Sequence, residues 1–181
     1  MKLKLLICDV SALRDLGKLE LLSQLPRLPY KTRTTSLAWS SSGVVICDDK
    51  PPDTLLNPVF IEKPTEASAT EAFRLRKRFR GLTLADSAVL NLAQNHEAAL
   101  LSSDPFIRMI AAKLGLEIME YNQLFHEMVV QGILTLTAAT EKYYELYYKV
   151  NRSCATEEQG RIVSLPLRSE LQAAGKRKTV G

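Results

Sequence analysis

Short apolar runs alternate with longer segments of helical pattern along this chain, and this alternation restricts the fold more than any other feature. The apolar runs predict strands at residues 2–8, 43–47, 98–102 and 116–119, with an edge strand at 59–62. The longer segments predict helices at residues 11–25, 65–80, 83–95, 105–114, 121–130 and 137–150, where Gly17 leaves open two short helices in place of one over 11–25. Residues 32–42 predict a short strand running into a helical turn. Because strands joined through helices pair in parallel, we expect an α/β fold. This is a three-layer α/β/α sandwich with a parallel central sheet, followed by a C-terminal helical extension.

The length of 181 residues fits one domain with an appendage. We expect the α/β domain over residues 1–135, the helical extension over 136–172 and a basic, flexible tail over 173–181. Four tyrosines recur at helical spacing in the extension: Tyr143, Tyr144, Tyr147 and Tyr148. This spacing favours a packing or dimer surface over a ligand-binding site, since aromatic residues are enriched at protein interfaces.

The composition is that of an ordinary globular protein, with 46% hydrophobic and 24% charged residues. The apolar runs are shorter than the roughly 20 residues of a membrane span, and the N-terminal run is too short for a signal peptide. We therefore expect a cytoplasmic protein without membrane contact. The three cysteines have no zinc-ligand spacing and predict free thiols. The net charge of +4 is compatible with a polyanionic partner without requiring one.

Three aspartates lie at junctions between predicted strands and helices. Asp9 directly follows the first strand, Asp104 follows the strand at 98–102, and Asp86 lies in the first turn of the helix at 83–95. In an open parallel sheet, ligands bind in the crevice beyond the carboxyl ends of the strands. Converging carboxylates raise one another's pKa unless a cation neutralises them. Oxygen ligands without Cys or His favour Mg²⁺ or Mn²⁺ as that cation.

Each of these aspartates also has a purely structural interpretation. Asp104-Pro105 matches a helix N-cap followed by proline at the first helical position. Thr83 and Asp86 match a capping box with Asp in place of Glu, and either Asp9 or Ser11 could cap the first helix. Residue type and spacing alone leave both interpretations open.

Three segments together resemble the PIN domain family. Residues 5–13 place Asp9-Val-Ser11 directly after a strand, as the family does. Residues 81–93 resemble the family's third-acid helix, in which an acid precedes an apolar stripe. Residues 99–117 resemble the next family segment, in which a strand ends in Ser or Thr, then Asp, then a helix closing on Leu-Gly. Residues 132–139 are similar to an extension that follows some PIN domains, and the likeness covers residues 3–150.

The resemblance implies a metal-dependent endoribonuclease acting on single-stranded RNA. It implies that Asp9, Asp86 and Asp104 are the catalytic residues and the ligands of Mg²⁺ or Mn²⁺, with Ser11 and Ser103 orienting them. The ion would activate water for hydrolysis and stabilise the phosphate's charge. Many family members are toxins of type II toxin–antitoxin pairs and form homodimers. An antitoxin protein and a second copy of the chain are therefore the further implied partners.

The sequence departs from the family pattern at one position. PIN domains usually carry a further Glu on the helix after the second strand, and residues 34–41 contain no acid. Ser36, Trp39 or Ser40 occupies the expected place. The acids that could substitute for it in space are Asp48, Asp49, Glu62, Glu66 and Glu71. This departure supports a second hypothesis, a catalytically weakened PIN-like module that binds RNA or a protein partner without cutting. A third is a structural dimer whose aspartates are helix caps.

A basic run closes the predicted helix at 65–80. Its members are Arg74, Arg76, Lys77, Arg78 and Arg80. We expect this run to bind RNA by following the phosphate backbone, with a solvated helix face as the alternative.

Overall fold

The computed structural model describes residues 4–44 and 60–150 and divides into two compact units, Met1–Glu120 and Tyr121–Gly181. The division falls earlier than the predicted domain boundary at residue 135. Helix α6 (Tyr121–Val130) therefore belongs to the second unit together with α7 (Leu136–Glu145). The predicted tail at 173–181, and the predicted extension beyond residue 150, lie outside the described residues.

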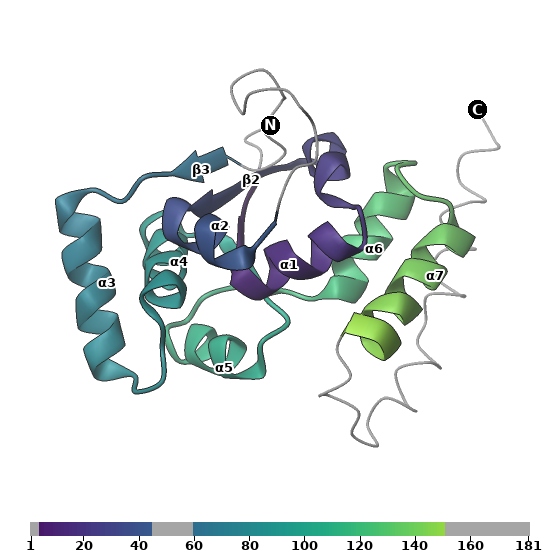
Figure 1. Cartoon of the computed structure of the whole chain (residues 1–181). Coiled ribbons are helices and arrows are strands. Elements are labelled where there is room, and N and C mark those ends of the chain that lie inside the picture. The colour runs from purple at the N-terminus through teal and green to yellow at the C-terminus, as the bar shows by residue number, and fades with distance from the viewer. Residues whose placement is uncertain (1–3, 45–59, 151–181) are drawn as a thin grey trace. The chain divides into compact units, whose positions relative to one another are not determined.

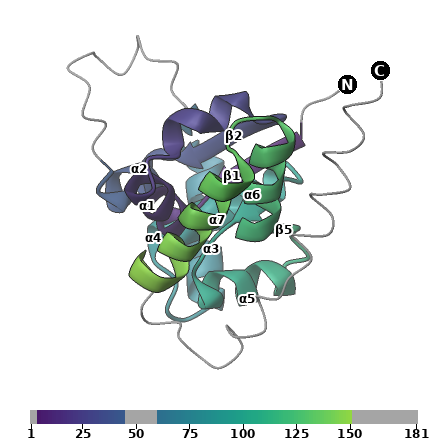
Figure 2. The same cartoon turned by 90° about the vertical axis from the view of Figure 1, so that its right-hand side faces the viewer.

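The first unit contains a five-stranded sheet in which every strand is parallel to its neighbours (Figure 1). The strand order is β3-β2-β1-β4-β5. The strands are β1 (Lys4–Cys8), β2 (Tyr30–Thr35), β3 (Phe60–Glu62), β4 (Ala99–Leu101) and β5 (Ile118–Met119). Helices lie on both sides of these strands, as Figure 1 and Figure 2 show. The predicted α/β fold, a three-layer α/β/α sandwich, is confirmed.

The strand prediction was wrong for the described part of residues 43–47. Gly43 ends helix α2 (Ser36–Ser42) as its C-cap at φ +67°, a left-handed conformation that glycine adopts without steric cost, and Val44 lies outside any strand. Residues 45–47 lie outside the described part of the chain. The second strand along the chain is instead β2, which leads directly into α2, as predicted for residues 32–42.

Helix α4 (Leu84–Asn95) is the most deeply buried helix that the structure describes in the first unit. It packs against β1, β2 and β4 and also against α3 (Glu66–Arg78), which lies outside it (Figure 1). This position explains why eight of the twelve residues of α4 are buried, whereas α3 buries only Ala72 and Leu75. The other helices among the unit's described residues are α1 (Val10–Lys18), the 3₁₀ helix η1 (Leu22–Arg27) and α5 (Pro105–Lys113).

The chain reverses its direction across the sheet between β1 and β4. From β1 it proceeds outward through β2 to β3, then returns to β4 and proceeds to β5 on the other side. Cys8 is in register with Leu101, so β1 and β4 end at the same level, and the Asp9 N–H donates to the Leu101 carbonyl at 3.2 Å. Such a reversal leaves a crevice at the carboxyl ends of the two strands. The residues that follow Cys8 and Leu101 border it.

The second unit contains α6 and α7, which pack against each other, and a π-helical turn, η2 (Leu146–Val150). Phe125 and Tyr143 join α6 to α7 through an edge-to-face ring contact, with centroids 5.9 Å apart. The predicted tyrosine cluster forms two ring pairs, Tyr143 with Tyr147 and Tyr144 with Tyr148. Within residues 4–44 and 60–150, every helix is too short or too polar to cross a membrane.

Candidate active site

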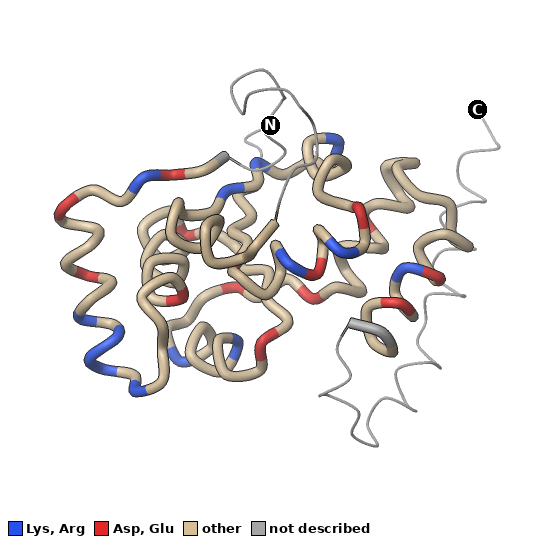
Figure 3. The backbone as a smooth tube through the Cα atoms, in the orientation of Figure 1, with Lys and Arg blue, Asp and Glu red and all other residues tan. Residues whose placement is uncertain are grey.

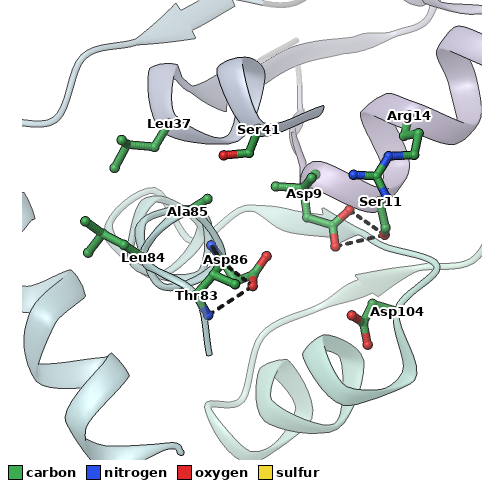
Figure 4. A pocket seen from close by; sticks show the side chains of 11 residues that line it. Asp9, Ser11, Arg14, Leu37, Ser41, Thr83, Leu84, Ala85, Asp86 and Asp104 are labelled. Atoms are coloured by element: carbon green, nitrogen blue, oxygen red, sulfur yellow. Dashed lines mark hydrogen bonds between the residues drawn. The ribbon is translucent and has the colours of Figure 1, made fainter. Parts of the chain in front are cut away.

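A pocket of about 490 Å³ opens at the carboxyl ends of β1 and β4 (Figure 4). Four segments that are distant in sequence border it: the start of α1, one face of α2, the start of α4 and the residue before α5. The lining residues are Asp9, Val10, Ser11, Arg14, Leu37, Ser41, Thr83, Leu84, Ala85, Asp86 and Asp104. The three aspartates singled out from the sequence thus line one pocket.

Asp9 is the most enclosed of the three, with 1% of its surface exposed. It is the N-cap of α1, where its Oδ1 accepts a hydrogen bond from the Ala12 N–H at 2.7 Å. The Ser11 hydroxyl lies 2.8 Å from Oδ1 and 3.0 Å from Oδ2, and the Ser102 hydroxyl donates to Oδ2. This carboxylate is therefore held in one orientation from three directions.

The environment of Asp9 makes its negative charge costly. Burial raises the pKa of Asp9 to about 6, and the nearby Asp86 carboxylate raises it further. Hydrogen bonds from Ser102, Ala12 and Ser11 lower this pKa and offset part of the effect. At neutral pH Asp9 is mostly ionised, so a cation in the pocket would offset the repulsion between the Asp9 and Asp86 carboxylates.

Asp86 is half-buried at the third position of α4 and forms a complete capping box with Thr83. The Thr83 N–H and hydroxyl donate to Asp86 Oδ2 at 3.2 and 2.5 Å, and the Asp86 N–H donates to the Thr83 hydroxyl at 3.1 Å. The capping box predicted from the sequence is confirmed. It fixes the Asp86 carboxylate at the pocket (Figure 4).

Asp104 is the half-buried N-cap of α5, with Pro105 at the first helical position. Its Oδ1 accepts from the N–H groups of Phe106 at 2.8 Å and Ile107 at 3.4 Å. The Asp104 N–H donates in turn to the Ser102 hydroxyl at 3.1 Å. Ser102 therefore connects Asp104 to Asp9.

The capping and pocket interpretations of the aspartates are compatible. The described hydrogen bonds of Asp86 fall on Oδ2 and those of Asp104 fall on Oδ1. The second oxygen of each carboxylate remains for another ligand, because an ionised carboxylate accepts through both oxygens. Each aspartate can cap its helix and contribute to the pocket at the same time.

The donor set suits a hard divalent cation, but it does not form a closed cage. Carboxylate and hydroxyl oxygens are the ligands that Mg²⁺ and Mn²⁺ favour. Within the described part of the chain, no three Asp, Glu, His or Cys side chains lie close enough together to hold one ion. An ion here would therefore keep part of its water shell, as Mg²⁺ usually does in proteins.

Helix α2 is the element on which the PIN resemblance leads us to expect a further acid. It presents Leu37 and Ser41 to the pocket, one helical turn apart, and neither is acidic. Ser36, Trp39 and Ser40, the positions named from the sequence, are not among the described lining residues. The described part of the pocket thus holds three carboxylates.

The acids considered as substitutes do not line the described pocket. Glu62 forms an ion pair with Arg33 at 3.0 Å and lies 3.6 Å from His96. Glu71 pairs with Arg74, and Glu66 begins α3. Asp48 and Asp49 lie outside the described residues.

The serines of the site differ partly from those expected. Ser11 contacts Asp9 as predicted, whereas the described contact of Ser103 with this network is its backbone N–H, which donates to the Ser11 hydroxyl at 3.0 Å. The second hydroxyl on Asp9 comes from Ser102. The register of Cys8 with Leu101 brings Ser102 level with Asp9. A strand's register cannot be read from its own sequence, so this residue was missed.

The predicted RNA-binding run is exposed at the end of α3 and in the segment that leads to α4 (Figure 3). Arg74 pairs with Glu71, and the Arg78 guanidinium lies 5.1 Å from the centre of the Phe79 ring. The five basic residues are not among the described lining residues, although Arg80 precedes the lining residue Thr83 closely in sequence. Basic residues in the last turn also stabilise α3 through its dipole.

Cys8, which precedes Asp9, is a free and fully buried thiol, as predicted. Burial raises the pKa of Cys8 far above its usual value, and the adjacent Asp9 charge raises it further. The thiol is therefore neutral and unsuited to nucleophilic attack.

No family model matches this chain, and no curated protein matches its sequence.

Proposed function

We propose that this protein is a divalent-metal-dependent endoribonuclease that hydrolyses single-stranded RNA in the pocket at the ends of β1 and β4. The observation that supports the proposal most strongly is that Asp9, Asp86 and Asp104, from three separate segments, line one pocket. The resemblance of residues 3–150 to PIN domains supports the same reaction and the same three residues.

At least one of Asp9, Asp86 and Asp104 would bind the cation directly and the others would bind it directly or through its water shell, with Mg²⁺ and Mn²⁺ as the candidates. A bound cation would supply a more acidic water as nucleophile and would offset negative charge on the scissile phosphate. The chain's own contribution is positioning. Two serine hydroxyls orient Asp9, and capping contacts at α4 and α5 fix Asp86 and Asp104. Catalysis under this scheme requires no covalent nucleophile.

The basic run at the end of α3 would bind the RNA backbone outside the pocket. Its exposed charges precede the start of α4, where Thr83 and Asp86 border the pocket. Basic side chains along such a path neutralise successive phosphates of a single strand.

A second candidate function is binding without cleavage, and the structure of α2 favours it. Leu37 and Ser41 occupy the face on which the resemblance leads us to expect an acid. Fewer carboxylates mean weaker cation binding. In this case the pocket would recognise RNA or a protein partner and would leave the phosphodiester intact.

An antitoxin protein and a second copy of the chain remain proposed partners through the same resemblance. The stacked Tyr144 and Tyr148, with 40% and 57% of their surfaces exposed, support a protein-contact surface in the second unit.

The proposal is tested by incubating labelled single-stranded RNA with the protein and Mn²⁺, with and without EDTA. We expect cleavage that EDTA abolishes and that Asp104→Asn lowers by about a hundredfold or more. Asparagine is as good an N-cap as aspartate, so this variant removes charge and keeps α5 capped. The matched control is Glu117→Gln, which removes an exposed acid that is absent from the described lining residues. Failure of the wild-type protein to cut at any Mn²⁺ concentration, with RNA still bound, would favour the second candidate.

A further inference from the structure

Arg14 is the single basic side chain among the described residues that line the pocket. Arg14 has no role in the proposed cation site, and it does not belong to the predicted RNA-binding run. An arginine that lines a pocket with three carboxylates can serve either to neutralise them or to bind a ligand of opposite charge.

The position of Arg14 on α1 directs it toward the pocket. It lies three residues after Ser11, so the two side chains share one face of the helix. Long side chains in helices lean toward the N-terminus, which for α1 is the end capped by Asp9. Figure 4 shows the Arg14 guanidinium beside Ser11 at the edge of the pocket.

Arg14 does not neutralise the aspartates through direct ion pairs. The ion pairs found among residues 4–44 and 60–150 involve Arg33, Arg74, His96, Arg108 and Lys142 as the basic partners. Within these residues no carboxylate therefore lies within 4.0 Å of the Arg14 guanidinium. Arg14 is exposed and keeps its hydrogen-bond donors available to a ligand.

We propose that Arg14 binds the two non-bridging oxygens of one phosphate of the substrate. This phosphate is the neighbour of the scissile phosphate, on which the carboxylates and their cation act. This proposal rests on the proposed function. A guanidinium matches the geometry of a phosphate through two parallel hydrogen bonds, which a lysine cannot reproduce. Arg14 would thus fix the register of the strand, and the pocket would select a phosphodiester over an uncharged substrate.

The test is the binding of a 2′-O-methyl oligonucleotide, shown by gel to remain uncut, measured by fluorescence anisotropy in Mg²⁺. The variants are Arg14→Ala, Arg14→Lys and, as a control of equal charge change, Lys113→Ala at the exposed far end of α5. Circular dichroism would verify that each variant is folded.

We expect Arg14→Ala to raise the dissociation constant about tenfold and to lower the salt slope by about 0.7, the value for one lost contact to a single strand. Arg14→Lys should keep the salt slope and recover part of the affinity, because charge remains and the paired hydrogen bonds do not. Lys113→Ala should bind within about twofold of the wild type.

The outcomes separate this proposal from the nuclease. Binding of Arg14→Ala at wild-type strength would overturn the Arg14 contact, whether or not the wild type cuts RNA. If Arg14→Ala binds the oligonucleotide more weakly than the wild type, and the wild type cuts no unmodified RNA in Mn²⁺, the Arg14 contact is supported and the nuclease proposal is overturned. Lack of any binding by the wild type would overturn both.

Discussion

The Ser102 hydroxyl donates a hydrogen bond to Asp9 Oδ2, and through it the segment after β4 holds the carboxylate that follows β1. The same hydroxyl accepts from the Asp104 N–H at 3.1 Å. One buried serine therefore fixes two of the three aspartates of the pocket relative to each other, across the reversal point of the sheet.

The first prediction concerns Ser102→Ala. Loss of the hydroxyl removes a hydrogen bond that lowers the pKa of Asp9, so that pKa should rise above about 6. It also removes the buried acceptor of the Asp104 N–H, so the free energy of unfolding should fall by about 1–3 kcal/mol. Urea unfolding and NMR titration of the Asp9 carboxyl measure the two effects. Ser103→Ala, which removes a neighbouring hydroxyl, is the control and should change the unfolding free energy by less than about 0.5 kcal/mol.

The second prediction concerns stability and pH without added metal. The folded pKa of Asp9, about 6, lies above its ordinary value of 3.8. Its contribution to stability is therefore fully present below pH 3.8 and is lost as the pH rises through about 6. The cost at neutral pH is on the order of 3 kcal/mol. Asp9→Asn should thus gain stability relative to the wild type as the pH rises from 4.5 to 7.5, as measured by urea unfolding in EDTA. A difference between the two proteins that stays constant over this range would contradict the effect of burial on Asp9.

The third prediction concerns cation binding and pH. Protons and the cation compete for Asp9, so the rise in melting temperature caused by Mn²⁺ should be large at pH 7.5 and small at pH 5. Asp104→Asn should reduce the rise at pH 7.5, and Glu117→Gln should leave it unchanged. An equal rise at both pH values would place the ion away from Asp9.

The fourth prediction concerns the basic run of α3. Arg76→Glu combined with Arg78→Glu should lower the affinity for single-stranded RNA and reduce the dependence of binding on salt. Arg27→Glu with Lys31→Glu is the control, since both residues are exposed and the change in charge is the same. Equal binding by the two double variants would assign the run to a solvated helix face.

The main pocket residues could be predicted because they follow from local rules. Asp9 and Asp104 follow strands and cap helices, and Asp86 lies in a capping box, so each position could be predicted from a short segment. Their meeting at one pocket depends on β1 lying beside β4 in the sheet, which the sequence pattern alone did not establish. The residues that depend on tertiary structure were missed. Ser102 requires the register of β4 on β1, and the pocket-facing residues of α2 depend on how that helix is rotated.

The second strand shows a related limit of sequence reasoning. The apolar run at 43–47 predicted a buried strand, yet β2 has the sequence Tyr-Lys-Thr-Arg-Thr-Thr. Its buried positions are Thr32, Thr34 and Thr35, whose β-branched side chains favour strands without forming an apolar run. The Thr34 hydroxyl is satisfied by the Cys8 carbonyl at 2.8 Å. A tertiary hydrogen bond thus compensates the burial of Thr34, and an apolar pattern does not reveal such a position.

The most direct measurement is an anomalous diffraction map from a crystal soaked in Mn²⁺ at pH 7.5. We predict one Mn²⁺ peak in the pocket, bound directly by at least one of Asp9, Asp86 and Asp104 and connected to the others directly or through ordered water. A map with no peak in the pocket, and with the three carboxylates engaged solely at their helix N-termini, would contradict a cation-dependent active site.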